Sequence, residues 1–361
     1  MVWFIFVTLV LLFTQLGVKR KQSYIYLGAR IVLLILLSLM TGLGSVAGTD
    51  HETYVNIFYA FNSWDNMTNF NTVLLSYAIE PGYAFLNIIA NSFRVPEPIF
   101  FVLISAIMNV SVVFLVYKFK KPVVAMLVFV LTINYLQEIN LARQCIAISL
   151  YCFSVYNLVQ RKYIYHFVLL FIAFTMHTTA ILCLPLSLLG FINVDKYKKQ
   201  IAIIASVFWF FSLLAQLNFF YFSSVGEIVG DLQGTRFESY ADGSHGVGYS
   251  LGFNYMYNLL FIFILLSLQT QANIYKILAL LGVILINLNI DVVLRFALYF
   301  LIFLPITCGE YLTTETYKKT PQHFGIVNAF NIIFIIYWII VLFRNNIIGD
   351  PYLGSKFYSL I

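Results

Sequence analysis

Two side chains that could carry out chemistry, an arginine and a histidine, lie inside otherwise apolar runs of this sequence. Arg143 follows Asn140-Leu141-Ala142 at the start of one run, and His177 lies in the middle of the next. An arginine in the first turn of a helix adds fixed positive charge to free backbone N–H groups, and together these bind an anion. An imidazole exchanges a proton near neutral pH. The pair indicates an anion-binding site with a proton acceptor, unless Arg143 simply reaches toward lipid headgroups.

Carboxylates form the second set of candidates. Glu80 precedes Pro81, so it could act as a base if burial raised its pKa, or it could only mark the start of a helix. Asp291 and Arg295 are four residues apart, which places them on one helix face where they can pair. His177 also has an alternative, a packing role in which its ring bonds a backbone carbonyl. Neither a disulfide framework nor a metal site is expected, because the cysteines lie within or at the edges of apolar runs and lack metal-ligand spacing (Cys145, Cys152, Cys183 and Cys308).

The composition indicates which elements must position these residues. Of the 361 residues, 61% are hydrophobic and 10% are charged, and the mean hydropathy is +0.89. Soluble domains do not have this composition, and apolar runs long enough to cross ~30 Å of hydrocarbon recur along the chain. The sequence therefore predicts a single polytopic domain over residues 1–361, an all-α integral membrane bundle of about twelve transmembrane helices. The net charge of +6 is then explained by cytoplasmic loops rather than by nucleic acid.

The predicted spans follow the apolar runs. The run 163–192 has basic residues at both ends, so it must turn back at His177 and Thr178, either as two short spans or as a bent hairpin. Loops 48–97 and 221–250 are predicted to be periplasmic, and residues 81–93 of the first are expected to form an interfacial or re-entrant helix with Asn87 and Asn91 on one face. The other predicted spans are 2–18, 26–47, 98–117, 122–137, 140–160, 200–220, 251–269, 273–288, 291–309 and 326–343.

Lysine and arginine divide unequally between the two sides of this topology. The predicted cytoplasmic loops carry mostly lysine, whereas the basic residues left outside are Arg94, Arg143, Arg236, Arg295, Arg344 and Lys356. Arginine is the residue that grips phosphate with two parallel hydrogen bonds. The outer face is therefore predicted to bind anions. The alternative is that these arginines pair with outer aspartates and glutamates.

Short motifs along almost the whole chain carry a family resemblance. They are Gly48-Thr49-Asp50 with Tyr54 and Phe58; Glu80-Pro81-Gly82-Tyr83 with Leu86-Asn87; Asn140-Leu141-Ala142-Arg143-Gln144 with Ala147; His177-Thr178-Thr179-Ala180 with Pro185; Arg295 with Tyr299 and Phe300; and Pro351-Tyr352. With these motifs in the family's order, the chain resembles the EpsG-type family of bacterial polysaccharide polymerases, which includes many Wzy-like O-antigen and capsule polymerases. It departs from the family before Asp50, where members often carry an arginine and this chain has Gly42-Leu43-Gly44-Ser45.

The resemblance implies a GT-C-like membrane glycosyltransferase of the bacterial inner membrane. Such enzymes transfer a growing glycan from undecaprenyl diphosphate onto the non-reducing end of a new lipid-linked repeat unit at the periplasmic face, with no cofactor. Donor and acceptor are both lipid-linked oligosaccharides, and a chain-length regulator protein is an expected partner. The catalytic candidates are then Arg143 as the leading diphosphate clamp, His177 as the base and Glu80 as the alternative base. The substrate-binding candidates are Arg236, Arg295, Gln144, Asp50, Asp291 and Tyr54.

Three other functions fit a polytopic chain with charges near one face. An O-antigen ligase shares the donor and the geometry. A flippase or transporter for lipid-linked oligosaccharides would also be polytopic, but the two halves of this sequence show no internal repeat of the kind many carriers have. A membrane acyltransferase would need a cytoplasmic face for its acyl donor, and the predicted cytoplasmic loops are short and rich in lysine.

Overall fold

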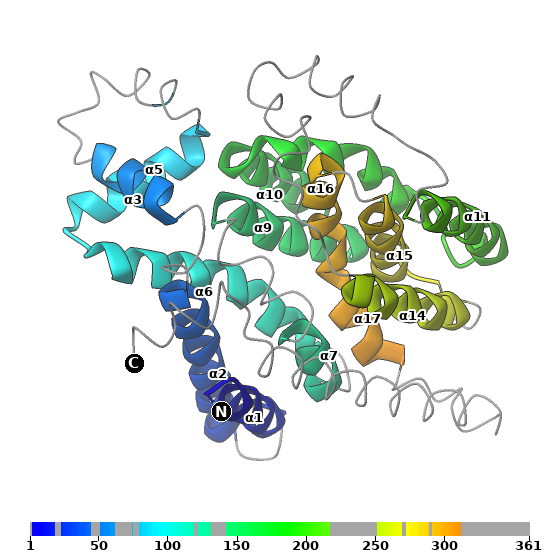
Figure 1. The fold of residues 1–361 in the computed structure, drawn as a ribbon, viewed down its shortest axis with the longest axis horizontal. Helices are drawn as coiled ribbons and strands as arrows, with labels where there is room; N and C mark the ends of the chain where they lie inside the picture. Colours follow the sequence, from blue (N-terminus) through cyan, green and yellow to red (C-terminus); the bar gives the residue numbers. More distant parts are fainter. Residues whose placement is uncertain are drawn as a thin grey trace. The chain divides into compact units, whose positions relative to one another are not determined.

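A computed structural model describes residues 2–18, 23–44, 51–61, 74, 79–118, 122–130, 142–216, 251–268, 272–288 and 291–311. All regular elements within these ranges are helices, so the all-α class is confirmed for the described part (Figure 1). The predicted span 326–343 and loop 221–250 lie outside it. The described residues form two compact units, one ending at Ser187 and the other running from Leu188 to Tyr311. This division concerns packing alone, and a single domain over residues 1–361 stays a prediction.

Within the described residues, one helix passes the length and hydropathy test for a membrane span. This is α6, Glu97–Val116, with 20 residues. Shorter apolar helices are Tyr24–Leu39, Tyr163–Met176, Thr178–Phe191, Tyr257–Leu268, Ile274–Asn287 and Arg295–Cys308. Several of them expose large apolar side chains; Ile164 is 79% exposed and Phe171 is 66% exposed. Such exposure is typical of a surface that contacts lipid or another protein. The number of about twelve spans stays a prediction.

The first unit is built around α6. Helices α1 (Val2–Leu16) and α2 (Ser23–Gly44) pack together, α2 also packs on α6, and α9 (Ala142–Val159) lies between α6 and α10 (Tyr163–Met176) (Figure 1). Gly42 lets α2 approach α6 closely, because a Cβ there would lie 2.6 Å from Val102 Cα. In a membrane, lipid tails are as apolar as the side chains, so burial of apolar surface gives helices little reason to associate. Small residues such as glycine then favour association because they let two helix backbones pack closely. The short helix α7 (Pro122–Phe129) packs on α1 and α6.

The chain reverses direction after α10, as the charge pattern predicted. α10 ends at Met176, His177 is extended with φ −156° and ψ 122°, and the 3-10 helix η4 runs over Thr178–Phe191. Near the far ends of the two helices, Ser187 Oγ lies 2.8 Å from His166 Nε2, so the second helix returns beside the first. The hydroxyl of Ser154 on α9 lies 2.6 Å from His166 Nδ1. A buried histidine therefore joins the three helices of this part of the unit.

Two short helices lie within residues 48–97, the segment predicted to be a periplasmic loop. Helix α3 (His51–Ala60) was not expected, and α5 (Pro81–Ser92) lies where an interfacial or re-entrant helix was predicted. With 12 residues, α5 is about 18 Å long and cannot cross the ~30 Å hydrocarbon core. Asn91 Nδ2 donates to the carbonyl oxygens of Phe58 at 2.8 Å and of Asn87 at 3.1 Å. The polar face predicted for α5 therefore joins it to α3.

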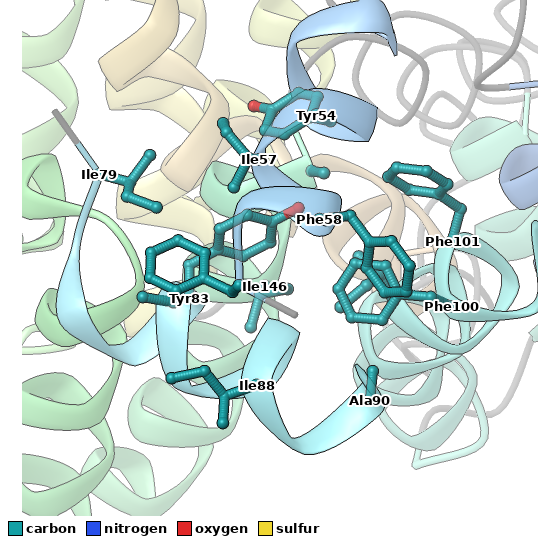
Figure 2. Close-up of a cluster of buried hydrophobic side chains, with 14 of the residues drawn as sticks. Tyr54, Ile57, Phe58, Ile79, Tyr83, Ile88, Ala90, Phe100, Phe101 and Ile146 are labelled. Carbon is teal, nitrogen blue, oxygen red and sulfur yellow. The ribbon is translucent and has the colours of Figure 1, made fainter. Parts of the chain in front are cut away.

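Aromatic side chains hold α3 and α5 against the start of α6. Phe58 and Phe100 have ring centroids 4.9 Å apart, and Tyr83 lies edge-on to Tyr54 at 5.9 Å. Figure 2 shows these rings gathered around the short helices. The cluster includes Ile146 from α9 as well. Burial of this apolar surface, at roughly 25 cal/mol per Å², fixes two short helices that would be marginal on their own.

The second unit is centred on α15 (Ile274–Asn287), which contacts α11 (Lys198–Gln216), α14 (Leu251–Leu268), α16 (Asp291–Leu301) and α17 (Phe303–Tyr311). The fully buried Asn287 donates to Asn258 Oδ1 at 2.8 Å, and Trp209 Nε1 donates to the same oxygen at 2.7 Å. This network links α11, α14 and α15. The helix within the predicted span 291–309 is interrupted at Ile302, and the span itself stays a prediction. Pro305 has no N–H to continue the hydrogen bonds of the preceding turn.

Gly82 provides a test of how closely α5 packs on α10. A Cβ at this position would lie 2.7 Å from both the carbonyl oxygen and Oγ1 of Thr175. We expect Gly82→Ala to push α5 away from α10 and to lower the free energy of unfolding by roughly 1–3 kcal/mol, the usual penalty of overpacking. Thermal unfolding of the purified chain in detergent measures this. Gly28→Ala is the matched control, because no atom lies within 4 Å of a Cβ there. Equal responses of the two variants would contradict the close contact.

Candidate functional site

Three segments far apart in the sequence meet at the carboxylate of Glu80. Arg143, 63 positions away, donates from Nη1 to Glu80 Oε2 at 2.7 Å. Thr178, 98 positions away, donates to Oε1 from its backbone N–H at 3.2 Å and from Oγ1 at 3.4 Å. His177 Nδ1 lies 4.0 Å from the same Oε1. The starts of α5, α9 and η4 therefore converge on one buried anionic group.

The local sequence around Glu80 explains why its carboxylate is available to the other segments. Glu80 is the N-cap of α5 with extended backbone angles, and Pro81 starts the helix, where a missing N–H costs nothing. The Glu80 side chain makes no capping hydrogen bond to its own helix. Gly82 lets this helix start approach Thr175 at the end of α10. The carboxylate is therefore held beside His177 and Thr178 instead of beside its own backbone.

Arg143 lies in the first turn of α9, as predicted from the sequence. A cation there is locally unfavourable because the helix N-terminus carries partial positive charge, and the ion pair with Glu80 offsets this. The guanidinium also lies 5.9 Å from the centroid of the Tyr54 ring. Its Nε is buried and has no hydrogen-bond partner among the described residues. The side chain is 18% exposed and that of Glu80 is 7% exposed, so the pair is largely shielded from water.

The surroundings of Glu80 keep its carboxylate ionised. Burial on its own raises the pKa of this group, but the charge of Arg143, the charge that His177 carries when protonated, and the Thr178 N–H outweigh it, so the pKa lies below its usual value. A base for neutral pH needs the opposite shift. Glu80 could act as the base only with a raised pKa, and in this state its pKa is not raised. What the geometry gives Glu80 is a positioning contact with Arg143, Thr178 and His177.

His177 is held by the residue two positions later. Thr179 donates its backbone N–H to His177 Nδ1 at 3.3 Å, and its Oγ1 lies 2.9 Å from the same nitrogen. A backbone N–H can only donate, so this contact favours the neutral tautomer with its proton on Nε2. When the ring takes up a second proton, the positive charge lies next to Glu80 Oε1. The site thus combines a fixed cation, an ionised carboxylate and an imidazole that can change its charge.

The other predicted site residues fall into three groups. Gln144 follows Arg143 on α9 and is buried, and Tyr54 on α3 is buried against Tyr83. Arg295 and the backbone of Asp291 belong to α16 in the second unit. Asp50, Arg236 and the side chain of Asp291 lie outside the described residues, so pairing between Asp291 and Arg295 stays a prediction.

Three residues that build the site were not among the predicted catalytic or binding residues. Thr178 and Thr179 supply hydrogen bonds to Glu80 and His177, and Gly82 permits the close approach of α5. The signal for the threonines was present, because Ser and Thr at the start of a helix usually bond nearby backbone or side-chain groups. Among the described residues, no group of three or more His, Cys, Asp or Glu side chains is arranged to hold a metal ion.

Comparison with protein families gives one finding that covers most of the chain. A family model described as the EpsG family matches residues 27–359. This range includes all the residues that meet at Glu80. Comparison with curated proteins and with solved structures gives no match.

Proposed function

The chain belongs to the EpsG family, and from this premise we propose that it is a membrane polysaccharide polymerase. In this proposal it transfers a growing glycan from undecaprenyl diphosphate onto the non-reducing end of a new lipid-linked repeat unit, at the periplasmic face of the bacterial inner membrane. The observation that supports it is the meeting of Arg143, His177 and Glu80 in a largely buried charged cluster. An O-antigen ligase, a flippase or a transporter are the alternatives that the experiment below separates.

The reaction needs a group that stabilises the departing diphosphate. The bond between the anomeric carbon of the donor glycan and its diphosphate oxygen breaks, and negative charge develops on undecaprenyl diphosphate. A guanidinium fixed at the start of α9 places positive charge where that charge develops, and its planar shape suits two phosphate oxygens at once. We assign this role to Arg143, with Arg236 and Arg295 as further contacts to the donor.

The reaction also needs a group that takes the proton of the acceptor hydroxyl. The hydroxyl oxygen forms the new bond to the anomeric carbon, and its proton passes to His177 in our proposal. Before the donor binds, Glu80 Oε1 lies 4.0 Å from His177 Nδ1 and orients the ring. Glu80 then acts by positioning and charge, not as the proton acceptor. Gln144, Tyr54, Asp50 and Asp291 are proposed to contact the sugars or to orient the arginines.

Arg143→Lys tests the role of the guanidinium in cells. Lysine keeps the charge but loses the planar fork that binds two phosphate oxygens. We expect a strain that carries only this variant to make lipopolysaccharide with single-unit caps, while the amount of protein in the membrane is unchanged; gel electrophoresis of the lipopolysaccharide gives the result. Arg94→Lys is the control, because Arg94 is exposed and lies outside the site.

Other gel patterns would point to other functions. Normal lipopolysaccharide ladders from both Arg143→Lys and Arg143→Ala would indicate that Arg143 only reaches toward the lipid headgroups at the membrane boundary. Bare core with retained lipid-linked polymer in a strain that lacks the gene would indicate a ligase. Lipid-linked units trapped inside the cell would indicate a flippase.

His177 variants test the proton acceptor in a purified assay with lipid-linked repeat units. Loss of a general base lowers turnover by ~10²–10⁴ while donor binding remains largely intact. We expect this for His177→Ala, and nearly the same for His177→Gln, because an amide can hold a hydroxyl but cannot take its proton. Glu80→Gln should keep part of the activity. An active His177→Gln together with an inactive Glu80→Gln would transfer the role of base to Glu80.

A further inference from the structure

The carboxylate of Glu80 accepts hydrogen bonds from two sets of donors that together resemble an anion-binding site. Its Oε2 accepts from Arg143 Nη1 at 2.7 Å, and its Oε1 accepts from the N–H and hydroxyl of Thr178 at the start of η4. A guanidinium beside the free N–H groups of a helix start is an arrangement that binds phosphate. Here both donor sets are directed at a carboxylate of the chain itself.

The edges of the Arg143 guanidinium show where a diphosphate would meet Glu80. A two-point grip needs two neighbouring N–H groups, either Nε with Nη2 or Nη1 with Nη2. Nε is buried by the protein, so the first edge is covered. Nη1 on the second edge already donates to Glu80. A diphosphate gripped along this second edge therefore competes with Glu80 for Nη1.

On these contacts, and resting on the proposed function, we propose that Glu80 holds the place of one phosphate group and is displaced when the donor diphosphate binds. Displacement frees Arg143 Nη1 and the Thr178 donors together, so the same groups that hold the carboxylate receive the phosphate oxygens. Glu80 in this account competes with the ligand. A carboxylate that only oriented Arg143 would instead assist binding, so the two roles predict changes of opposite sign in one experiment.

The experiment measures binding of inorganic pyrophosphate to the purified full chain by isothermal titration calorimetry. Glu80→Gln keeps the size of the side chain and removes its charge. If Glu80 occupies Arg143 for at least nine-tenths of the time, its removal lowers the apparent dissociation constant about tenfold or more, because that constant is divided by the open fraction. Glu97→Gln is the matched control, since Glu97 also lies at a helix start in this unit but outside the cluster. It should bind pyrophosphate as the wild type does.

Arg143→Ala separates failure of this inference from failure of the proposed function. Tighter binding by Glu80→Gln with loss of binding by Arg143→Ala supports displacement. Equal or weaker binding by Glu80→Gln, with binding still lost in Arg143→Ala, overturns displacement and leaves the diphosphate role of Arg143 intact. Wild-type binding by Arg143→Ala overturns both.

A measurement on the wild-type chain covers the case in which Glu80→Gln does not fold. Glu80 loses its guanidinium partner on displacement, so added pyrophosphate should change the carboxylate bands in the infrared difference spectrum. The same change should appear in Glu97→Gln. An unchanged carboxylate region in the wild-type spectrum at saturating pyrophosphate overturns the inference.

Discussion

The site depends on the cost of holding the Glu80 carboxylate away from water. An ionised carboxylate in a largely buried position is unfavourable unless charges and hydrogen bonds surround it. Arg143 supplies them from one stretch of the chain, and the adjacent His177 and Thr178 supply them from another. The ion pair also relieves Arg143, whose charge is unfavourable at a helix start. Neither charged group is stable where it lies without the other, so the start of α5 and the start of α9 must come together.

The packing around this pair explains how a short helix is held in place within the segment predicted to be a periplasmic loop. α5 is too short to cross a bilayer, and it is held by Tyr83 in the aromatic cluster, by Asn91 bonded to Phe58, and by the contact of Gly82 with Thr175. α10 ends just after Thr175, the residue that Gly82 approaches, because the backbone at His177 is extended. The break directs the Thr178 N–H at Glu80 and leaves His177 beside it. The motifs that gave the family resemblance thus correspond to a helix start, a close contact and a chain reversal.

Local signals predicted the parts of the site that local chemistry determines. Pro81 after Glu80 predicted the helix start, and the basic residues around 163–192 predicted the reversal at His177. Pairing of the outer arginines with outer aspartates and glutamates was an open alternative, but Glu80 was not identified as the partner of Arg143 across 63 positions, because spacing in one sequence says nothing about which distant charges meet. Helix α3 was missed although Tyr54, Ile57 and Phe58 have helical spacing, because the charged residues beside them suggested a loop. The interruption at Ile302 was missed although Pro305 was visible.

A double-mutant cycle between Glu80 and Arg143 tests most directly whether this ion pair organises the site. The free energy of unfolding of the purified chain is measured for the wild type, Glu80→Gln, Arg143→Gln and the double variant. The account predicts that the double variant loses less stability than the sum of the two single losses, with a coupling of about 0.5–3 kcal/mol. The same cycle between Glu97 and Arg143 should be additive. Additive losses for Glu80 and Arg143, within about 0.3–0.5 kcal/mol, would contradict the account.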